Sequence, residues 1–282
     1  NNCFVIPSDK KIKTDFYISK DNCLNVKNND KVIVELLDWP EGAKSPFGKI
    51  ITILGKHDNI EVEKNAILHK YDITPDFKHS SLLELQKISA KIPEYEITRR
   101  NDLRKIKSFT IDPEDAKDFD DAISVKQINE DLYEIGVHIA DVSHYIPEGS
   151  SLDKEAYERG CSVYLENYVV PMIPEKLSNK ICSLRPKEDK LCFSVLFEIS
   201  KNGSVKKSWI GKTIINSDYR LTYADAQNII NGSNHKLKKE ISILHNLSQK
   251  FRKKRIQKGS VIINQEEIKI VFNNKNGPIK AK

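Results

Sequence analysis

Short apolar runs separated by polar turn formers fill the first quarter of the chain. The runs "KVIVELLDWP" (31–40), "GKIITILG" (48–55) and "NIEVEKNAIL" (59–68) are broken by segments such as "NND" and "EGAKSPFG". Apolar runs of this length with turn residues between them are typical of β-strands. Several short strands within about 75 residues predict a small barrel, and both an OB-type and an SH3-like barrel fit this pattern.

Apolar residues three or four positions apart mark the helices. In "SSLLELQKISAKI" (80–92) this spacing predicts a helix that ends before Pro93 and joins the barrel to a second domain. Residues 236–258 also place their apolar positions on one helical face, with nine Lys/Arg and the single Glu240 on the rest. This pattern favours a core-packing helix with a solvated basic face, and a face that follows a phosphate backbone is the alternative.

The second domain mixes helices with strands. Shorter helices are expected at 151–160 before Gly160, from Pro174 onward, and after Thr222, an N-cap with Asp225 three residues on. Strand-like segments lie at 107–111, 121–128, 132–142, 191–200, 204–215 and 267–272, and "KNG" (201–203) predicts a hairpin turn. The predicted fold class is therefore α+β, with a barrel over 1–75, a linker over 76–100 and a mixed domain over 101–282.

The composition limits the class of protein to which the chain can belong. The chain has 282 residues, of which 39% are hydrophobic and 30% charged, as expected for a soluble globular protein. No apolar run is long enough to span a bilayer, so no membrane association is expected. The five cysteines (Cys3, Cys23, Cys161, Cys182 and Cys192) are scattered without a CxxC pair, which predicts reduced thiols and a cytoplasmic location.

One segment runs against the formal net charge of +6. "TIDPEDAKDFDDA" (110–122) holds six carboxylates within ten residues, and Lys117 is the one base among them. A solvated acidic loop is the commoner explanation of such a cluster. However, apolar strands flank it, Phe119 lies inside it, and Pro113 restricts the residue before it to an extended conformation.

A bound divalent cation would offset the repulsion within this cluster. Carboxylate clusters suit Mg²⁺, Mn²⁺ or Ca²⁺ rather than zinc, and the glycine and glutamate positions of an EF-hand are missing. The remaining possibility is a catalytic Mg²⁺ site that acts on phosphodiesters, which also suits a basic chain that binds a polyanion.

The segment "TIDPEDAKDFDDAISV" resembles the signature of the ribonuclease II / ribonuclease R family of hydrolytic 3′-to-5′ exoribonucleases. "YEIGVHIADVSHYIPEG", "VPMIPEKLSNKICSLRP" and "SDYRLTYADAQNII" resemble successive blocks of its catalytic RNB domain. Upstream, "FVIPSD" and "RNDLR" resemble its cold-shock-type OB domain and the following link. The resemblance is closer to ribonuclease R, and it implies an OB barrel followed by the N-terminal part of an RNB domain.

The resemblance also implies site residues. It identifies Asp112, Asp118, Asp120 and Asp121 as the catalytic residues that hold Mg²⁺, or Mn²⁺ in its place, and it leaves Glu114 and Asp115 outside the set. Asp120 is expected to be the most sensitive to substitution. Tyr164 matches an aromatic residue that stacks on an RNA base, and Tyr223 matches a residue near the ribose.

The resemblance implies processive degradation of single-stranded RNA to nucleoside 5′-monophosphates, with no obligate protein partner. A non-catalytic RNA-binding relative of the same fold is the alternative. The family's later block with its catalytic arginine has no counterpart here, so the chain is expected to be a truncated piece with little activity alone. His138 and His144 invite a metal-ligand interpretation, although structural histidines are favoured, and Cys182 and Cys192 are expected to be buried apolar residues.

Overall fold

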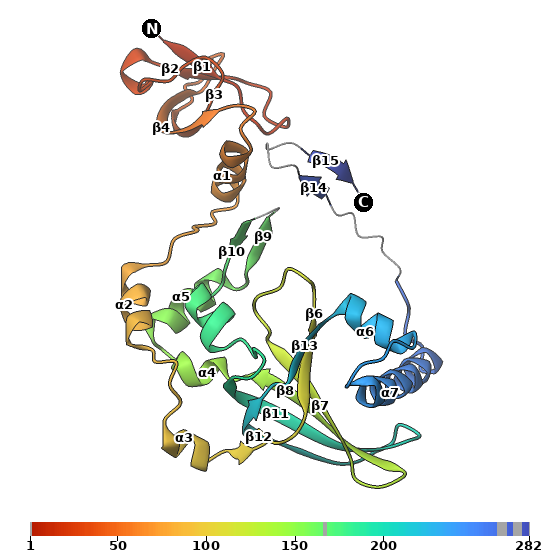
Figure 1. The fold of residues 1–282 in the computed structure, drawn as a ribbon. Coiled ribbons are helices and arrows are strands. Elements are labelled where there is room, and N and C mark those ends of the chain that lie inside the picture. Colours follow the sequence, from red (N-terminus) through yellow and green to blue (C-terminus); the bar gives the residue numbers. More distant parts are fainter. Residues whose placement is uncertain (1, 166–167, 264–269, 273–277, 282) are drawn as a thin grey trace. The chain divides into compact units, whose positions relative to one another are not determined.

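The computed structural model describes residues 2–165, 168–263, 270–272 and 278–281. The chain forms two compact units (Figure 1). The first comprises the described residues of Asn1–Asp76, Tyr164–Val170 and Ile268–Lys282, and the second those of Phe77–Val163 and Pro171–Glu267.

The first unit is built on a four-stranded sheet with strand order β1-β2-β4-β3. The sheet encloses a small core of Ile18, Cys23 and Ile50, which valines of β3 help to cover. The elements of this unit are β1 (Cys3–Val5), β2 (Phe16–Ile18), the 3₁₀ turn η1 (Lys20–Asn22), β3 (Asp30–Asp38), β4 (Phe47–Lys56), α1 (Ile60–Lys70), β10 (Tyr168–Val170), β14 (Ile270–Phe272) and β15 (Pro278–Ala281).

Two predictions for this unit are wrong. The run 59–68 forms helix α1 instead of a strand, because the side chain of Asn59 accepts a hydrogen bond from the Glu61 amide and so caps the first turn. Cys3 and Cys23 form a disulfide, whereas the sequence predicted reduced thiols. The antiparallel pairing of β1 with β2 sets Cys3 opposite Ile18, close to the turn that carries Cys23.

The second unit is built on a seven-stranded sheet with strand order β13-β6-β7-β8-β11-β12-β5. Its strands are β5 (Asn101–Asp102), β6 (Ser108–Asp112), β7 (Asp121–Gln127), β8 (Leu132–Ala140), β11 (Asp189–Ser200), β12 (Val205–Asn216) and β13 (Tyr219–Thr222). Its helices are α2 (His79–Lys87), α3 (Glu94–Thr98), α4 (Val142–Tyr145), α5 (Ser151–Arg159), the π-helical turn η2 (Leu177–Ile181), α6 (Tyr223–Ile230) and α7 (Lys238–Gln257). Along the chain, the division between the two units falls within strand β9 (Val163–Leu165), after Val163, and β9 pairs with β10.

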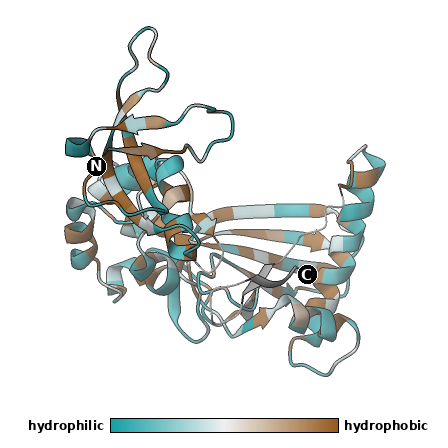
Figure 2. Ribbon diagram, turned by 90° about the horizontal axis from the view of Figure 1, so that it is seen from above, coloured by the Kyte–Doolittle hydropathy of each residue, from teal (hydrophilic) through white to brown (hydrophobic). Residues whose placement is uncertain are grey.

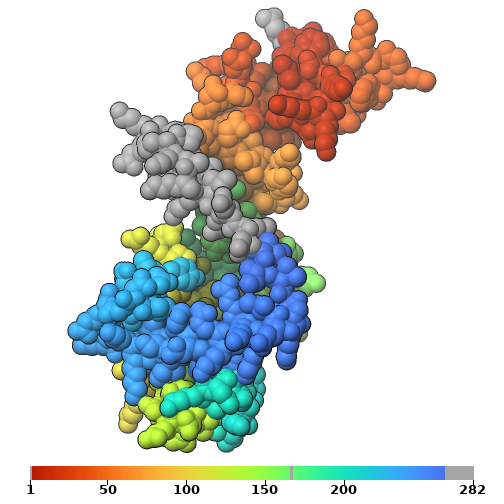
Figure 3. Space-filling model, turned by 90° about the vertical axis from the view of Figure 1, so that its right-hand side faces the viewer, coloured from red at the N-terminus to blue at the C-terminus, as the bar shows by residue number. Residues whose placement is uncertain are grey.

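Both faces of this sheet are covered. On one face, Ala122 and Cys192 pack with Leu152 of α5 and Leu177 of η2. On the other face, Val125 and Ile135 pack with Leu247 of α7. Helix α7 mixes apolar and hydrophilic residues along its length (Figure 2), and the outer surfaces of α6 and α7 face the viewer in Figure 3. The core-packing prediction for this helix is therefore confirmed, whereas its phosphate-binding alternative stays a prediction.

Helices α2 and α5 each supply a carboxylate that accepts hydrogen bonds from amides at the N-terminus of the other helix. The Glu84 carboxylate of α2 accepts hydrogen bonds from the Ser151 and Leu152 amides, both at 2.9 Å. In return, the Glu155 carboxylate of α5 accepts from the Lys78 amide at 3.1 and 3.2 Å. The first amides of a helix lack partners within the helix, so each helix supplies the acceptor that the other needs. Helix α2 ends at Lys87, five residues before the predicted end at 92.

Candidate active site

The four predicted aspartates lie in or beside one connection of the central sheet. Strand β6 ends at Asp112, strand β7 begins at Asp121, and the two strands pair in antiparallel fashion with Phe109 opposite Ile123. In an antiparallel pair, the last residue of one strand and the first residue of the next lie at the same end of the sheet. Residues 113–120, which we call the aspartate loop, therefore lie between two carboxylates that the strands fix.

Phe119 anchors this loop. Its ring packs against the cluster formed by Leu177, Leu184 and Cys192. Its amide donates a hydrogen bond to the Ser183 hydroxyl at 3.0 Å, and its carbonyl accepts one from the Leu184 amide at 2.8 Å. An apolar residue within an acidic segment is thus explained, because it attaches the loop to the core.

The carboxylates differ in exposure. Asp112 is 8% exposed, and its Oδ2 atom is buried without a hydrogen-bond partner in the part of the chain that the structure describes. Asp118 is half-buried, whereas Asp120 and Asp121 are exposed. Burial raises the pKa of Asp112, and repulsion from Asp121 and Asp118 adds to this rise. Partial loss of hydration likewise raises the pKa of Asp120, although much of its surface remains exposed, and repulsion from the other three carboxylates adds to this rise. The four carboxylates therefore act on one another as one electrostatic group.

The donor chemistry of this group suits a hard divalent cation. A buried carboxylate oxygen without a partner, next to carboxylates that repel one another, is the environment that Mg²⁺ or Mn²⁺ would stabilise. However, the described residues include no set of three or more acidic, histidine or cysteine side chains arranged to hold a metal ion. A cation would therefore have to draw the exposed side chains of the loop toward Asp112.

The other predicted site residues fall in different places. Strand β13 pairs in parallel with β6 and sets Thr222 opposite Asp112, so Tyr223 follows directly at the aspartate end of the sheet, with 63% of its surface exposed. Tyr164 lies on β9 and is 68% exposed, but it is grouped with the first unit, whereas the aspartates belong to the second. Within the second unit, the structure therefore places Tyr223 at the same end of the sheet as the aspartates, and the stacking role of Tyr164 stays a prediction. Glu114 and Asp115 are exposed residues of the loop, outside the set of four.

The surroundings of His138 indicate a structural role in the core of the sheet. It is fully buried between Ser194, which is 2.8 Å from Nδ1, and Ser124, which is 2.9 Å from Nε2. A Cβ atom at Gly136 would lie 2.4 Å from the Ser124 hydroxyl and 2.7 Å from the His138 ring, so this arrangement requires glycine there. Because both ring nitrogens already have hydroxyl partners, His138 is a satisfied core residue, as the favoured interpretation predicted.

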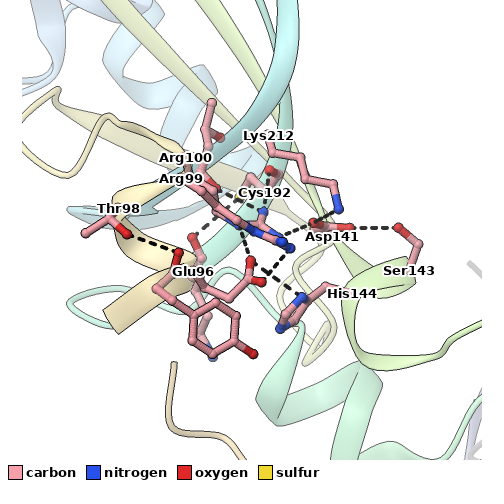
Figure 4. Close-up of polar contacts among 12 residues, drawn as sticks. Glu96, Thr98, Arg99, Arg100, Asp141, Ser143, His144, Cys192 and Lys212 are labelled. Atoms are coloured by element: carbon pink, nitrogen blue, oxygen red, sulfur yellow. Dashed lines mark hydrogen bonds and ion pairs between the residues drawn. The ribbon is translucent and has the colours of Figure 1, made fainter. Parts of the chain in front are cut away.

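A group of buried charges, which we call the Arg100 hub, lies just beyond the strand that supports Asp120. The Ala140 amide donates to the Asp120 carbonyl at 2.9 Å, and the next residue is Asp141. Arg100, with a fully buried side chain, lies 2.7 Å from the Asp141 carboxylate and 3.0 Å from that of Glu96 (Figure 4). His144 faces Glu96 at 3.7 Å, so its environment too is an ion-pair network. Nothing in the sequence patterns pointed to this hub.

Two further residues near the loop also escaped prediction. Arg220 of β13 donates to the carbonyls of Pro113 and Glu114, and Ser183 contacts the backbone on both sides of Asp118. Both stand in blocks that carry the resemblance, "SDYRLTY" and "ICSLRP", but residue type and spacing alone give them no role.

Asp120→Asn should raise the melting temperature of the chain at pH 7 without divalent cations. The folded-state pKa of Asp120 is raised, so the ionised carboxylate is less favourable in the folded chain than in the unfolded chain. Ionisation of Asp120 therefore lowers the free energy of unfolding as the pH rises through that pKa. Asparagine does not ionise, so the variant keeps this free energy at pH 7. A rise of roughly 1–3 °C in a thermal melt is expected, with no change for the control Glu114→Gln at an exposed position of the same loop. An equal or lower melting temperature for Asp120→Asn would contradict the electrostatic account.

Comparison with known proteins gives consistent matches. The RNB domain family matches residues 100–282, and the cold shock domain family matches residues 4–78. Ribonuclease R of Thermotoga maritima is 38% identical over 284 aligned residues, which cover 98% of this chain and 40% of that protein. The "Inactive exonuclease DIS3L2" of Arabidopsis thaliana is 41% identical over 202 residues, which cover 71% of this chain and 19% of that protein.

Solved structures agree with the sequence matches. Mycoplasma genitalium RNase R in complex with double-stranded RNA aligns with a TM-score of 0.88 and 26% identity, over 95% of this chain and 49% of that one. The predicted fold, a cold-shock-type OB domain followed by RNB-domain structure, is thereby confirmed. The chain spans about 40% of the length of the ribonuclease R proteins that it matches. Among the residues that the structure describes, none of the helices combines the length and the apolar character of a membrane span.

Proposed function

We propose that this chain, which belongs to the RNB-domain family, is part of a hydrolytic 3′-to-5′ exoribonuclease. The proposed enzyme degrades single-stranded RNA processively and releases nucleoside 5′-monophosphates. The aspartate loop and the strand ends on either side of it carry the proposal, because together they place all four signature carboxylates at one end of the central sheet. The resemblance of the chain to ribonuclease R over nearly its whole length supports the same activity.

The proposed reaction is the hydrolysis of the terminal phosphodiester. Water adds to phosphorus, the bond from phosphorus to the 3′ oxygen of the preceding nucleotide breaks, and that oxygen takes a proton to become the new 3′ hydroxyl. A Mg²⁺ ion held by Asp112, Asp118, Asp120 and Asp121 would supply positive charge beside the phosphate oxygens. Asp120 is exposed at the end of the loop, which suits a carboxylate that accepts a proton from the attacking water.

The first unit offers a surface for RNA bases. Phe4, Tyr17 and Phe47 stand opposite one another on β1, β2 and β4. Their rings meet edge to face with centroids 5.6 and 5.5 Å apart, and Phe4 and Phe47 are 62% and 38% exposed. Bases stack on aromatic rings without regard to sequence, which suits an enzyme that degrades any RNA.

A non-catalytic RNA-binding relative is the second candidate. Two observations favour it: one of the matched relatives is described as an inactive exonuclease, and the described carboxylates form no ready metal shell. Against it, all four signature aspartates are present in this chain.

Product analysis separates the two candidates. The complete protein that contains this chain is incubated with uniformly labelled single-stranded RNA and Mg²⁺, and the products are resolved by chromatography. We expect nucleoside 5′-monophosphates to accumulate from the earliest times while undegraded RNA remains, as a processive exonuclease requires. RNA that is bound but stays intact would exclude the nuclease and favour the binding relative.

A further inference from the structure

We propose that Arg220 and Ser183 are positioning residues that clamp the aspartate loop from two sides and so set the geometry of its carboxylates. The consequence for cation binding rests on the proposed function, in which these carboxylates hold a divalent ion. Neither residue carries a carboxylate, and neither has a role in the proposed reaction.

Arg220 holds the beginning of the loop. Its Nη2 atom donates to the Pro113 carbonyl at 2.5 Å and to the Glu114 carbonyl at 2.9 Å. Its guanidinium carbon lies 5.6 Å from the centroid of the Phe119 ring, within the range of a cation–π contact. One half-buried side chain thus touches the first two residues after Asp112 and the residue before Asp120.

Ser183 holds the end of the loop. It is fully buried, its hydroxyl donates to the Lys117 carbonyl at 3.0 Å, and the same hydroxyl accepts from the Phe119 amide at 3.0 Å. Those two backbone groups lie on either side of Asp118. The Leu184 amide adds a bond to the Phe119 carbonyl at 2.8 Å, so the backbone on both sides of Asp118 is fixed by the core.

The loop needs such external contacts. It contains no strand or helix, and within it the structure shows one backbone hydrogen bond, from the Ala116 amide to the Pro113 carbonyl at 3.2 Å. The carboxylates that it carries repel one another, which favours their separation. Hydrogen bonds from Arg220 and Ser183 oppose that separation without neutralising the carboxylates through direct ion pairs.

An effect of Arg220 through its charge and an effect through holding the loop would change cation binding in opposite directions. If the guanidinium acted through its positive charge alone, its removal would strengthen the binding of a cation to the nearby carboxylates. If it acts by holding the loop, its removal weakens that binding. Lysine keeps the charge but not the planar fork that reaches two carbonyls, so Arg220→Lys separates the two effects.

The experiment measures backbone order and cation affinity on the full 282-residue chain. Hydrogen exchange of the Ala116 and Phe119 amides, which both donate hydrogen bonds, is followed without divalent ions, and Mn²⁺ affinity is followed by electron paramagnetic resonance. Arg220→Met and Ser183→Ala should each speed exchange in the loop at least about 10-fold and weaken Mn²⁺ binding by about 10–100-fold. Arg220→Lys should also weaken Mn²⁺ binding, because lysine keeps the charge but cannot hold both carbonyls.

Arg252→Met is the matched control, because it removes an exposed arginine of α7 and the same unit of charge. It should change neither measurement, and circular dichroism should show that every variant is folded. Unchanged loop exchange in Arg220→Met and Ser183→Ala, or tighter Mn²⁺ binding in Arg220→Met, would overturn the clamp. A wild-type chain that binds no Mn²⁺ would instead overturn the proposed cation site, while the exchange rates still decide whether the clamp exists.

Discussion

Arg100→Met should lower the free energy of unfolding by about 3–5 kcal/mol, the usual cost of removing one partner from a buried ion pair. The Arg100 side chain is fully buried, and it lies against two carboxylates, Glu96 and Asp141, that are 2% and 1% exposed. It also donates to the main-chain oxygens of Cys192 and Thr213, at 3.3 and 3.4 Å. Methionine fills a similar volume but would leave two buried carboxylates without this partner.

Urea denaturation at pH 7 measures this effect, and Arg99→Met provides the control. Arg99 pairs with the same Glu96, but its side chain is 54% exposed, so its loss should change stability by no more than about 1 kcal/mol. The destabilisation by Arg100→Met should also shrink at low pH, because protonation removes the charges that the variant leaves buried. Equal costs for the two arginine variants would contradict the hub as a determinant of stability.

The contribution of His138 to stability should disappear in mild acid. Burial lowers the pKa of His138 to about 4, from 6.5 for an exposed histidine. Between these values the unfolded chain binds a proton that the folded chain does not, so stability rises with pH in this window. The contribution is complete above about pH 6.5 and is lost as the pH falls toward 4, and it amounts to roughly 3 kcal/mol.

Nuclear magnetic resonance can follow this titration directly. The Cε1 proton of His138 should keep its neutral-form chemical shift down to about pH 5, and His138→Gln identifies the signal by its absence. Urea denaturation of the same variant should show a shallower pH dependence than wild type between pH 4 and 6.5. A His138 signal with a midpoint near 6.5 would show that the ring is not held neutral between Ser124 and Ser194.

Regular elements with strong periodicity could be predicted from the sequence. The long helix α7, the β11–β12 hairpin around Gly203 and the capping box of Thr222 with Asp225 all formed as expected. The strand predicted for 59–68 was wrong. Ile60 and Val62 alternate with polar residues as in a strand, but the Asn59 side chain caps the first turn of a helix. Local pattern is weak evidence where one hydrogen bond at a cap settles the outcome.

Part of the candidate site could also be predicted. The aspartates stand together in the sequence, so their proximity required only a connection between two strands. The clamp is different, because Arg220 and Glu114 are 106 positions apart and meet through the parallel pairing of β13 with β6. Arg100 and Asp141 are likewise distant in the sequence and form an ion pair only in the folded chain. Contacts of this kind depend on topology, which residue patterns along the chain do not contain.

The nuclease assay of Asp120→Asn in the complete protein tests the central claim most directly. Wild type and variant are compared for release of nucleoside 5′-monophosphates from single-stranded RNA in Mg²⁺, and RNA affinity is measured in parallel. We predict a loss of at least about 100-fold in product release, with RNA affinity within a few-fold of wild type. Product release by the variant at the wild-type rate would contradict the assignment of the aspartate loop as the catalytic centre.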